Sequence, residues 1–189
     1  LMLLAAAWIV ERVGMAFGGG WPKALFLLSN NLFLGSIVAM LLWTLIRHRN
    51  ADSYRDNVFF LIMLPGFLVA KYLMLEGGEF PAGYSMAMGL FRLAFLVMLE
   101  RTLTQFMKGA FSVQILRHAK LDMAIKLLGL LLVLEFALPR PLTAAISLLL
   151  ATLLSIRFFY WKPHLALRRI DIGVMYVGYL CIVGQLLIE

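Results

Sequence analysis

The chain is dominated by apolar stretches, each of about 20 residues, that follow one another with only short polar connections. A helix needs roughly 20 apolar residues to cross a hydrocarbon core of about 30 Å, so each stretch has the length of a membrane span. The stretches lack the alternation of apolar and polar residues that barrel strands show. With 63% hydrophobic residues and a mean hydropathy of +0.92, the sequence predicts an all-α fold, a polytopic transmembrane helix bundle.

About seven candidate spans can be drawn, and turns containing Gly or Pro separate several of them. The spans are residues 1–18, 24–46, 58–75, 84–107, 121–138, 142–160 and 171–188. Short connections predict antiparallel neighbours, and residues 1–189 are expected to form one transmembrane domain. Leu1 already lies inside an apolar run and is not an initiator Met, so we expect the chain to be part of a longer membrane protein.

Basic residues are divided unequally between alternate connections, which is the signal that orients membrane proteins. One set of connections contains ten Lys and Arg residues, and the other contains two, Lys23 and Arg140. The ten are Arg47, Arg49, Arg55, Lys108, Arg117, Lys120, Arg157, Lys162, Arg168 and Arg169. The positive-inside rule predicts that these connections are cytoplasmic, with the N-terminus of the chain inside and its C-terminus outside. This signal also explains the net charge of +7 without a nucleic-acid partner.

Several charged residues lie within the predicted spans, where an unpaired charge costs several kcal/mol and usually has a functional reason. The candidate functional charges are Glu11, Arg12, Lys71, Arg92, Glu100 and Arg101. Arg92 would lie about 13 Å from the start of its span, too deep to reach the headgroups easily. Glu11 lies at the same depth in the first span, so we expect these two side chains to pair. Arg101 lies near the far end of its span, where it shares a polar stripe with Thr104, Gln105 and Lys108.

Two further charges, Lys126 and Glu135, lie near the two ends of the span predicted for residues 121–138. We expect both to be solvated or to reach the headgroups. The aromatic residues near span ends are expected to form the interfacial belt. They are Trp21, Trp43, Tyr54, Tyr84, Tyr160 and Trp161.

Residues that could hold a metal ion or carry out catalysis are sparse. The three histidines, His48, His118 and His164, lie in the basic connections and lack the spacing of a chelate on one helix turn. Cys181 is the single cysteine, which excludes an internal disulfide. The methionines are scattered as packing residues usually are. The sequence therefore assigns no metal ligand and no catalytic residue, and it leaves open whether the protein is an enzyme.

Several short motifs occur in the order and spacing of a known membrane-protein family. They begin with Trp8-x-x-x-Arg12, a short Gly/Pro turn and a helix that closes on Arg47. They continue with Phe91-Arg92-Leu93-Ala94, Glu100-Arg101, Phe106-Met107-Lys108, Arg157-x-x-x-Trp161, Leu167-Arg168 and Gly178-Tyr179-Leu180. The succession covers most of the chain and resembles the NnrS family of nitric-oxide-response membrane proteins.

The resemblance implies a bacterial inner-membrane protein of about a dozen helices, of which this chain is the middle part. It implies binding of haem and copper, a role in nitrosative stress, and nitric oxide or a related small molecule as a partner beside the lipid bilayer. Arg12, Arg92 and Arg101 match family positions. The chain departs from the family where Lys71 and Leu75 replace Asn and His and where Tyr176 replaces His. Both changes remove an imidazole, which leaves two alternatives: this member has lost some of the metal ligands, or it binds its cofactors through helices partly outside this chain.

Two other functions fit the same residues. In a transporter or channel, Glu11, Lys71, Arg92 and Arg101 would line a polar route for an anion or for protons. In a non-catalytic membrane scaffold, the charges would form structural pairs only, and replacing Arg92 would change stability and nothing else. Bound metal would favour the NnrS-like function, substrate flux would favour a transporter or channel, and the absence of both would favour a scaffold.

Overall fold

The structure is a computed structural model that describes residues 2–48, 57–76, 79–112, 118–166 and 169–188. These residues form helices and turns and contain no strand, which confirms the all-α prediction. The helices are α1 (Met2–Phe17), α2 (Lys23–Arg47), α3 (Val58–Glu76), α4 (Phe80–Phe111), α5 (Ala119–Leu132), α6 (Arg140–Tyr160), α7 (Pro163–Ala166) and α8 (Ile170–Ile188), with 3-10 turns η1 (Gly18–Gly20) and η3 (Glu135–Ala137).

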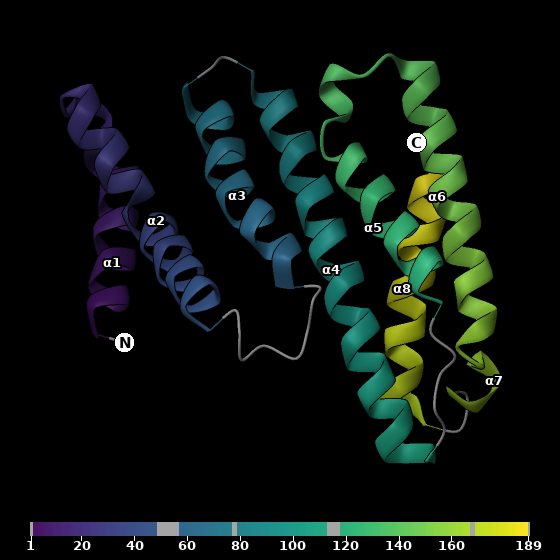
Figure 1. Ribbon diagram of the computed structural model, residues 1–189. Coiled ribbons are helices and arrows are strands. Elements are labelled where there is room, and N and C mark those ends of the chain that lie inside the picture. Colours follow the sequence, from purple (N-terminus) through teal and green to yellow (C-terminus); the bar gives the residue numbers. More distant parts are fainter. Residues whose placement is uncertain (1, 49–56, 77–78, 113–117, 167–168, 189) are drawn as a thin grey trace.

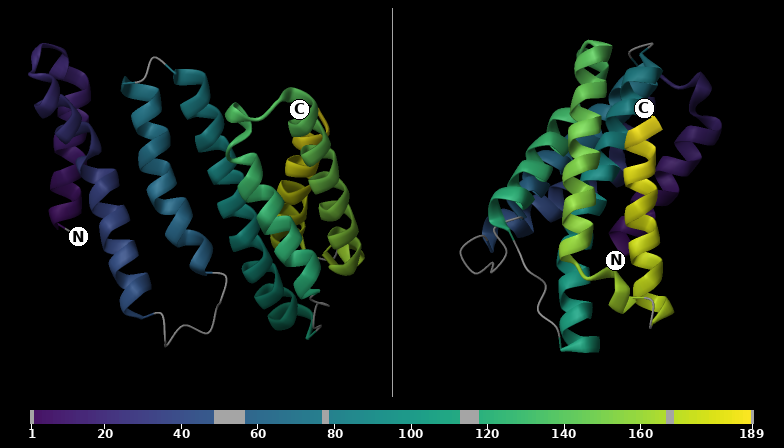
Figure 2. Two further views of the ribbon diagram at one scale, coloured as in Figure 1. Left: turned by 45° about the horizontal axis from the view of Figure 1, so that its top comes forward. Right: turned by 90° about the vertical axis from the view of Figure 1, so that its right-hand side faces the viewer.

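The long helices stand side by side in a row that largely follows the chain (Figure 1). The α1–α2 hairpin lies at one edge, α3 and α4 lie in the middle, and α5, α6 and α8 gather at the other edge, an order that the left view in Figure 2 also shows. Successive helices run in opposite directions, as the short connections predicted. Among the described residues, six helices are long and apolar enough to cross a membrane.

Close approach between α1 and α2 depends on glycine. A Cβ added at Gly14 would lie 2.3 Å from Ser29 Oγ, and one added at Gly18 would lie 2.9 Å from the ring of Phe26. Small residues four apart let two membrane helices approach closely. The turn η1 and then Pro22, which precedes the first residue of α2, complete the hairpin.

Helices α3 and α4 pack through a second glycine contact. A Cβ added at Gly83 would lie 2.7 Å from the carbonyl oxygen of Ala70 and 2.8 Å from the backbone nitrogen of Met74. A cluster of buried residues fills this interface: Met63, Ala70, Met86, Leu90, Leu93, Val97 and Val133. Helix α4 has 32 residues and is about 48 Å long, so it extends beyond a hydrocarbon core of about 30 Å.

Residues 121–138 differ from the continuous span that the sequence predicts. Helix α5 has 14 residues, about 21 Å, and is therefore too short to cross the core alone. It ends in two tight i→i−3 hydrogen bonds, from Val133 N–H to Leu130 and from Leu134 N–H to Leu131, and η3 follows. At this point the backbone of Val133 lies against Gly89 of α4. A Cβ added at Gly89 would be 3.0 Å from the Cα of Val133.

Helices α4, α5, α6 and α8 enclose the largest apolar core of the described residues. Its fully buried members include Leu103, Met107, Ile125, Leu150, Leu154 and Tyr179. This core surrounds several charged side chains that come from different helices, and those side chains form the candidate functional site.

Candidate functional site

Glu100 lies at the centre of a buried network of charges. It is on the face of α4 that also carries Leu96, Leu103 and Met107, and this face packs into the core. Its Oε2 atom is 2.8 Å from Nη2 of Arg157 on α6 and 3.1 Å from Nζ of Lys126 on α5. The side chains of all three residues are 5% exposed or less. Glu100 therefore joins three helices through two charge-assisted contacts.

Arg157 extends the network to a second carboxylate. Its Nε atom is 3.2 Å from Oδ1 of Asp122 on α5. Asp122 and Lys126 are four residues apart, so they project from the same side of α5 toward the partners on α4 and α6. The guanidinium of Arg157 also lies 4.4 Å from the ring centroid of Trp161, one turn further along the chain. Arg157 thus has two carboxylates and one aromatic face around it.

Two tyrosines of α8 donate hydrogen bonds to backbone carbonyls beside the network, one within α6 and one at its C-terminal end. The Tyr176 hydroxyl donates to the carbonyl oxygen of Trp161 at 2.5 Å, and the Tyr179 hydroxyl donates to that of Leu154 at 2.8 Å. The rings of Trp161 and Tyr179 are 5.0 Å apart between centroids. Buried Tyr and Trp residues usually find such hydrogen-bond partners. These contacts attach α8 to the helix that carries Arg157.

The four charged side chains carry two negative and two positive charges. A single charge left in such a dry interior would cost several kcal/mol, and pairing with good geometry repays that cost. The network therefore connects the helices through ion pairs, and its positive and negative charges cancel. Nucleophilic or acid–base chemistry would need a reactive group open to a substrate, and these side chains are enclosed instead.

A second, smaller cluster joins α1, α2 and α3. Lys71 Nζ is 2.8 Å from Glu11 Oε1, and it also donates to the backbone carbonyl oxygen of Asn30. The other carboxylate oxygen of Glu11 accepts the backbone N–H of Phe33 at 3.1 Å. The Lys71 and Glu11 side chains are 17% and 9% exposed. One ion pair thus connects the N-terminal hairpin to α3.

The expected pair of Glu11 with Arg92 is wrong. Helix α3 lies between the hairpin and α4 (Figure 1), so Lys71 reaches Glu11 first. Arg92 is buried on α4, where it lines an open groove of about 470 Å³ together with Gln185 of α8. Equal depth in two predicted spans does not say which helices are neighbours.

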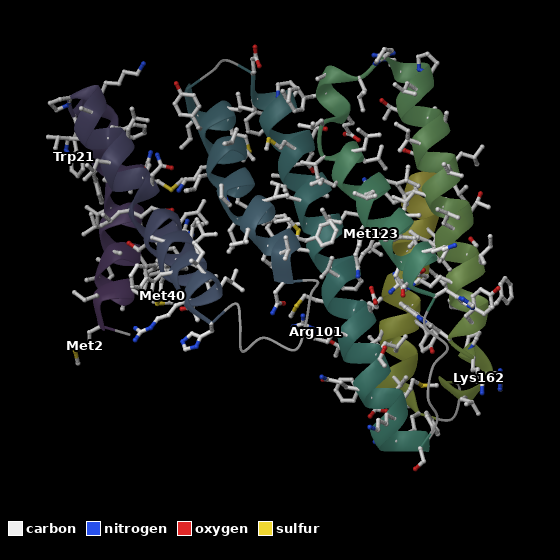
Figure 3. The ribbon with its side chains drawn as sticks, viewed as in Figure 1. Met2, Trp21, Met40, Arg101, Met123 and Lys162 are labelled. Carbon is white, nitrogen blue, oxygen red and sulfur yellow. The ribbon has the colours of Figure 1, made fainter. Side chains whose placement is uncertain are left out.

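The other two predicted arginines lie apart from both clusters. Arg12 is exposed, and its guanidinium is 5.6 Å from the ring centroid of Trp8 on the same helix. Arg101, labelled in Figure 3, donates from Nη2 to Oδ1 of Asn57 at 2.6 Å, near the start of α3. Of the six predicted charges, the structure brings together Glu11 with Lys71, and it places Glu100 at the centre of the larger network.

Four residues of the network were assigned other roles or none by the sequence. Lys126 was expected to reach solvent or headgroups, Arg157 was counted among the basic connections, Trp161 was placed in the interfacial belt, and Asp122 was not considered. Each is 9% exposed or less. The signals that indicate them are the spacing Asp122-x-x-x-Lys126 on one helix face and Arg157-x-x-x-Trp161 on another. Glu135 is half-buried and accepts from the Ser85 hydroxyl.

The aromatic and basic residues predicted near helix ends can be compared with their positions in the structure. Trp21, Trp43, Tyr84 and Tyr160 are exposed, as an interfacial belt requires. Tyr54 and the basic residues Arg49, Arg55, Arg117 and Arg168 lie outside the described residues. Removing the buried Arg157 from the ten cytoplasmic basic residues leaves nine against two, so the topology signal keeps its sign.

Side chains that commonly bind metal ions are dispersed over the described residues. No three His, Cys, Asp or Glu side chains gather there as a metal site would require. His48 follows α2, His118 precedes α5, and His164 lies in α7, so the three imidazoles belong to different helix ends. The ring of His118 instead packs against Tyr160, 4.8 Å between centroids.

Comparison with known proteins identifies a family. The family model described as "NnrS protein" matches residues 1–189, which is the whole chain. Neither a curated protein nor a solved structure gives a significant match.

Proposed function

The chain belongs to the NnrS family, and from this premise we propose that it acts in the bacterial inner membrane in the response to nitric oxide. The observation that carries the proposal is the family match over all 189 residues. Six helices in the described part of the chain have the length and composition of membrane spans, which agrees with a multi-pass protein. The nitric-oxide role comes from the family resemblance.

Haem and copper, which the resemblance implies, do not fit the residues described here. The histidines are dispersed over separate helix ends, and no group of three metal-binding side chains is found in the described part of the chain. We therefore derive no chemical step through either group. We propose that the longer protein binds them through helices partly outside residues 1–189.

The buried charges support a structural role for this part of the protein. Glu100, Asp122, Lys126 and Arg157 balance one another in charge and connect α4, α5 and α6. Helices held together by ion pairs can give rigid support to a site built elsewhere. We propose that these helices form the frame on which the cofactor-bearing helices are held.

A transporter in which Glu11, Arg92 and Arg101 line one route is not favoured. Glu11 is bound by Lys71, Arg92 lies beside α8, and Arg101 contacts Asn57. The three side chains occupy different surroundings in the described structure, and α3 lies between the first and the other two.

The test is an optical spectrum and metal analysis of the full-length protein purified in detergent. We expect a haem absorption band and bound copper, and we expect both to persist when His48, His118 and His164 are all replaced by Ala. Loss of the haem band in that triple variant would contradict the proposal that the ligands lie outside this chain.

The nitric-oxide role is tested by growth. A strain lacking the protein should grow more slowly under nitric oxide and should recover with the wild-type gene; equal growth would contradict the proposed role.

A further inference from the structure

The polar cluster at the junction of α1, α2 and α3 contains more than the Glu11–Lys71 ion pair, because the backbone oxygen and the buried side chain of Asn30 belong to it. We propose that this junction is a site for a monovalent cation, in which the ammonium group of Lys71 is a tethered occupant that a free cation displaces. The proposal is independent of the nitric-oxide role. It rests on the oxygen atoms around Lys71 Nζ, on the Asn30 side chain and on the charge of the cluster.

The oxygen atoms around Lys71 Nζ are of the type that alkali cations prefer. One is the carboxylate oxygen Oε1 of Glu11 at 2.8 Å, and the other is the backbone carbonyl oxygen of Asn30. Carboxylate and carbonyl oxygens are the usual ligands of hard cations, and membrane transporters use helix carbonyls in the same way. An ammonium group and a free monovalent cation can therefore use the same donors.

The side chain of Asn30 provides the independent observation. Asn30 is 0% exposed, and neither Oδ1 nor Nδ2 has a hydrogen-bond partner among the described residues. Buried side-chain amides are nearly always hydrogen-bonded, so an unpartnered one has donor and acceptor capacity left for a further group. The same residue already places its backbone oxygen on Lys71 Nζ. A cation in this position would keep that backbone oxygen.

The charge of the cluster selects a monovalent ion. Glu11 is its one carboxylate, and the backbone N–H of Phe33 donates to its other oxygen, Oε2, at 3.1 Å. One positive charge neutralises this carboxylate, whereas a divalent ion would leave an excess charge inside the membrane, which is costly. The Lys71 side chain has a flexible stem and is the more exposed partner of the pair, 17% against 9%, so it can withdraw.

The first experiment removes the tethered ammonium group from the full-length protein. Lys71→Ala should unfold at a temperature about 2–4 °C higher in sodium or potassium chloride than in N-methylglucamine chloride of equal ionic strength. The double variant Lys71→Ala with Glu11→Gln should lose this difference. Lys120→Ala, which removes an exposed lysine of α5, is the matched control. A response of Lys71→Ala no larger than that of the control would overturn the proposal.

The second experiment uses the wild-type protein and decides the question if Lys71→Ala does not fold. Labelling by a membrane-permeant amine reagent is measured by mass spectrometry. The extent of Lys71 labelling should rise at least about twofold when sodium replaces N-methylglucamine. Lys126, whose ammonium is paired with Glu100 in the other cluster, should be labelled equally in both salts. An unchanged ratio of Lys71 to Lys126 labelling would refute displacement by a cation.

Discussion

At the scale of single residues, the Tyr176 hydroxyl shows how α8 is attached to the charged network. It donates to the Trp161 carbonyl, and Trp161 in turn stacks on Arg157. Tyr176→Phe removes the donor and leaves a buried carbonyl without it, which should lower the free energy of unfolding by about 1–3 kcal/mol. Tyr160→Phe, at an exposed position, is the control and should be nearly neutral. Thermal or denaturant unfolding in detergent compares the two, and equal stabilities would argue against this hydrogen bond.

Ser147 gives a prediction of the opposite sign. Its side chain is 1% exposed, and its Oγ atom has no hydrogen-bond partner among the described residues. Ser147→Ala removes a buried polar atom with little change in volume, so stability should stay the same or rise by about 1 kcal/mol. Ser155→Ala on the same helix loses a hydrogen bond to the Ala151 carbonyl at 2.8 Å and serves as comparison. A clear loss of stability in Ser147→Ala would show that the hydroxyl is in fact bonded.

Single residues also show what sequence reasoning can and cannot supply. That Glu11, Lys71, Arg92 and Glu100 avoid lipid followed from the cost of charge in hydrocarbon, and all four are buried or half-buried. The identity of their partners did not follow, because pairing depends on which helices touch. Lys126 and Arg157 were misassigned because a position near a helix end suits both a headgroup and an internal carboxylate.

At the scale of elements, the contact between α3 and α4 depends on one glycine. Gly83→Ala would place a Cβ 2.7 Å from the Ala70 carbonyl oxygen, and backbone atoms of a neighbouring helix cannot move aside cheaply. We expect Gly83→Ala to destabilise the protein by about 1–3 kcal/mol.

Gly109 on the same helix is the matched control, because an added Cβ there meets nothing within 4 Å. Gly109→Ala should be neutral or stabilising by about 0.5–1 kcal/mol through helix propensity alone. The melting temperatures of the two variants test the contact, and similar values for both would contradict it.

Helix positions were predicted well because apolar length and Gly/Pro turns directly mark membrane spans. Residues 121–138 were the exception. The hydropathy of that stretch is continuous, but its backbone turns where Val133 packs against Gly89. The turn coincides with a contact to another helix, and hydropathy along the chain does not contain such contacts.

At the scale of the whole molecule, the row of helices explains why the charges form two clusters. The Glu11–Lys71 pair lies at the hairpin edge, and the Glu100 network lies among α4, α5 and α6. The first cluster draws on α1, α2 and α3 and the second on α4, α5 and α6, so the two share no helix. Each cluster brings its own positive and negative charges together, so each can be tested without disturbing the other.

Orientation in the membrane is also a property of the whole molecule. The basic connections predict that His164 in α7 faces the cytoplasm and that Trp21, at the opposite end of the molecule in Figure 3, faces the periplasm. In a Cys181→Ser background, the variants His164→Cys and Trp21→Cys can be labelled with an impermeant thiol reagent in intact cells. We expect labelling of the Trp21→Cys variant only, and the reverse pattern would invert the topology.

The central claim, that Glu100 and Lys126 are parts of one charge-balanced network, is tested most directly by a double-mutant cycle in the full-length protein. Glu100→Gln and Lys126→Met each leave an unbalanced buried charge and should each cost about 3–5 kcal/mol of stability. The double variant restores equal numbers of positive and negative charges, so it should recover about 1–3 kcal/mol relative to the sum of the two. Glu100→Gln combined with Lys120→Met, an exposed lysine, should be additive. Additive losses in the Glu100→Gln and Lys126→Met pair would contradict the network.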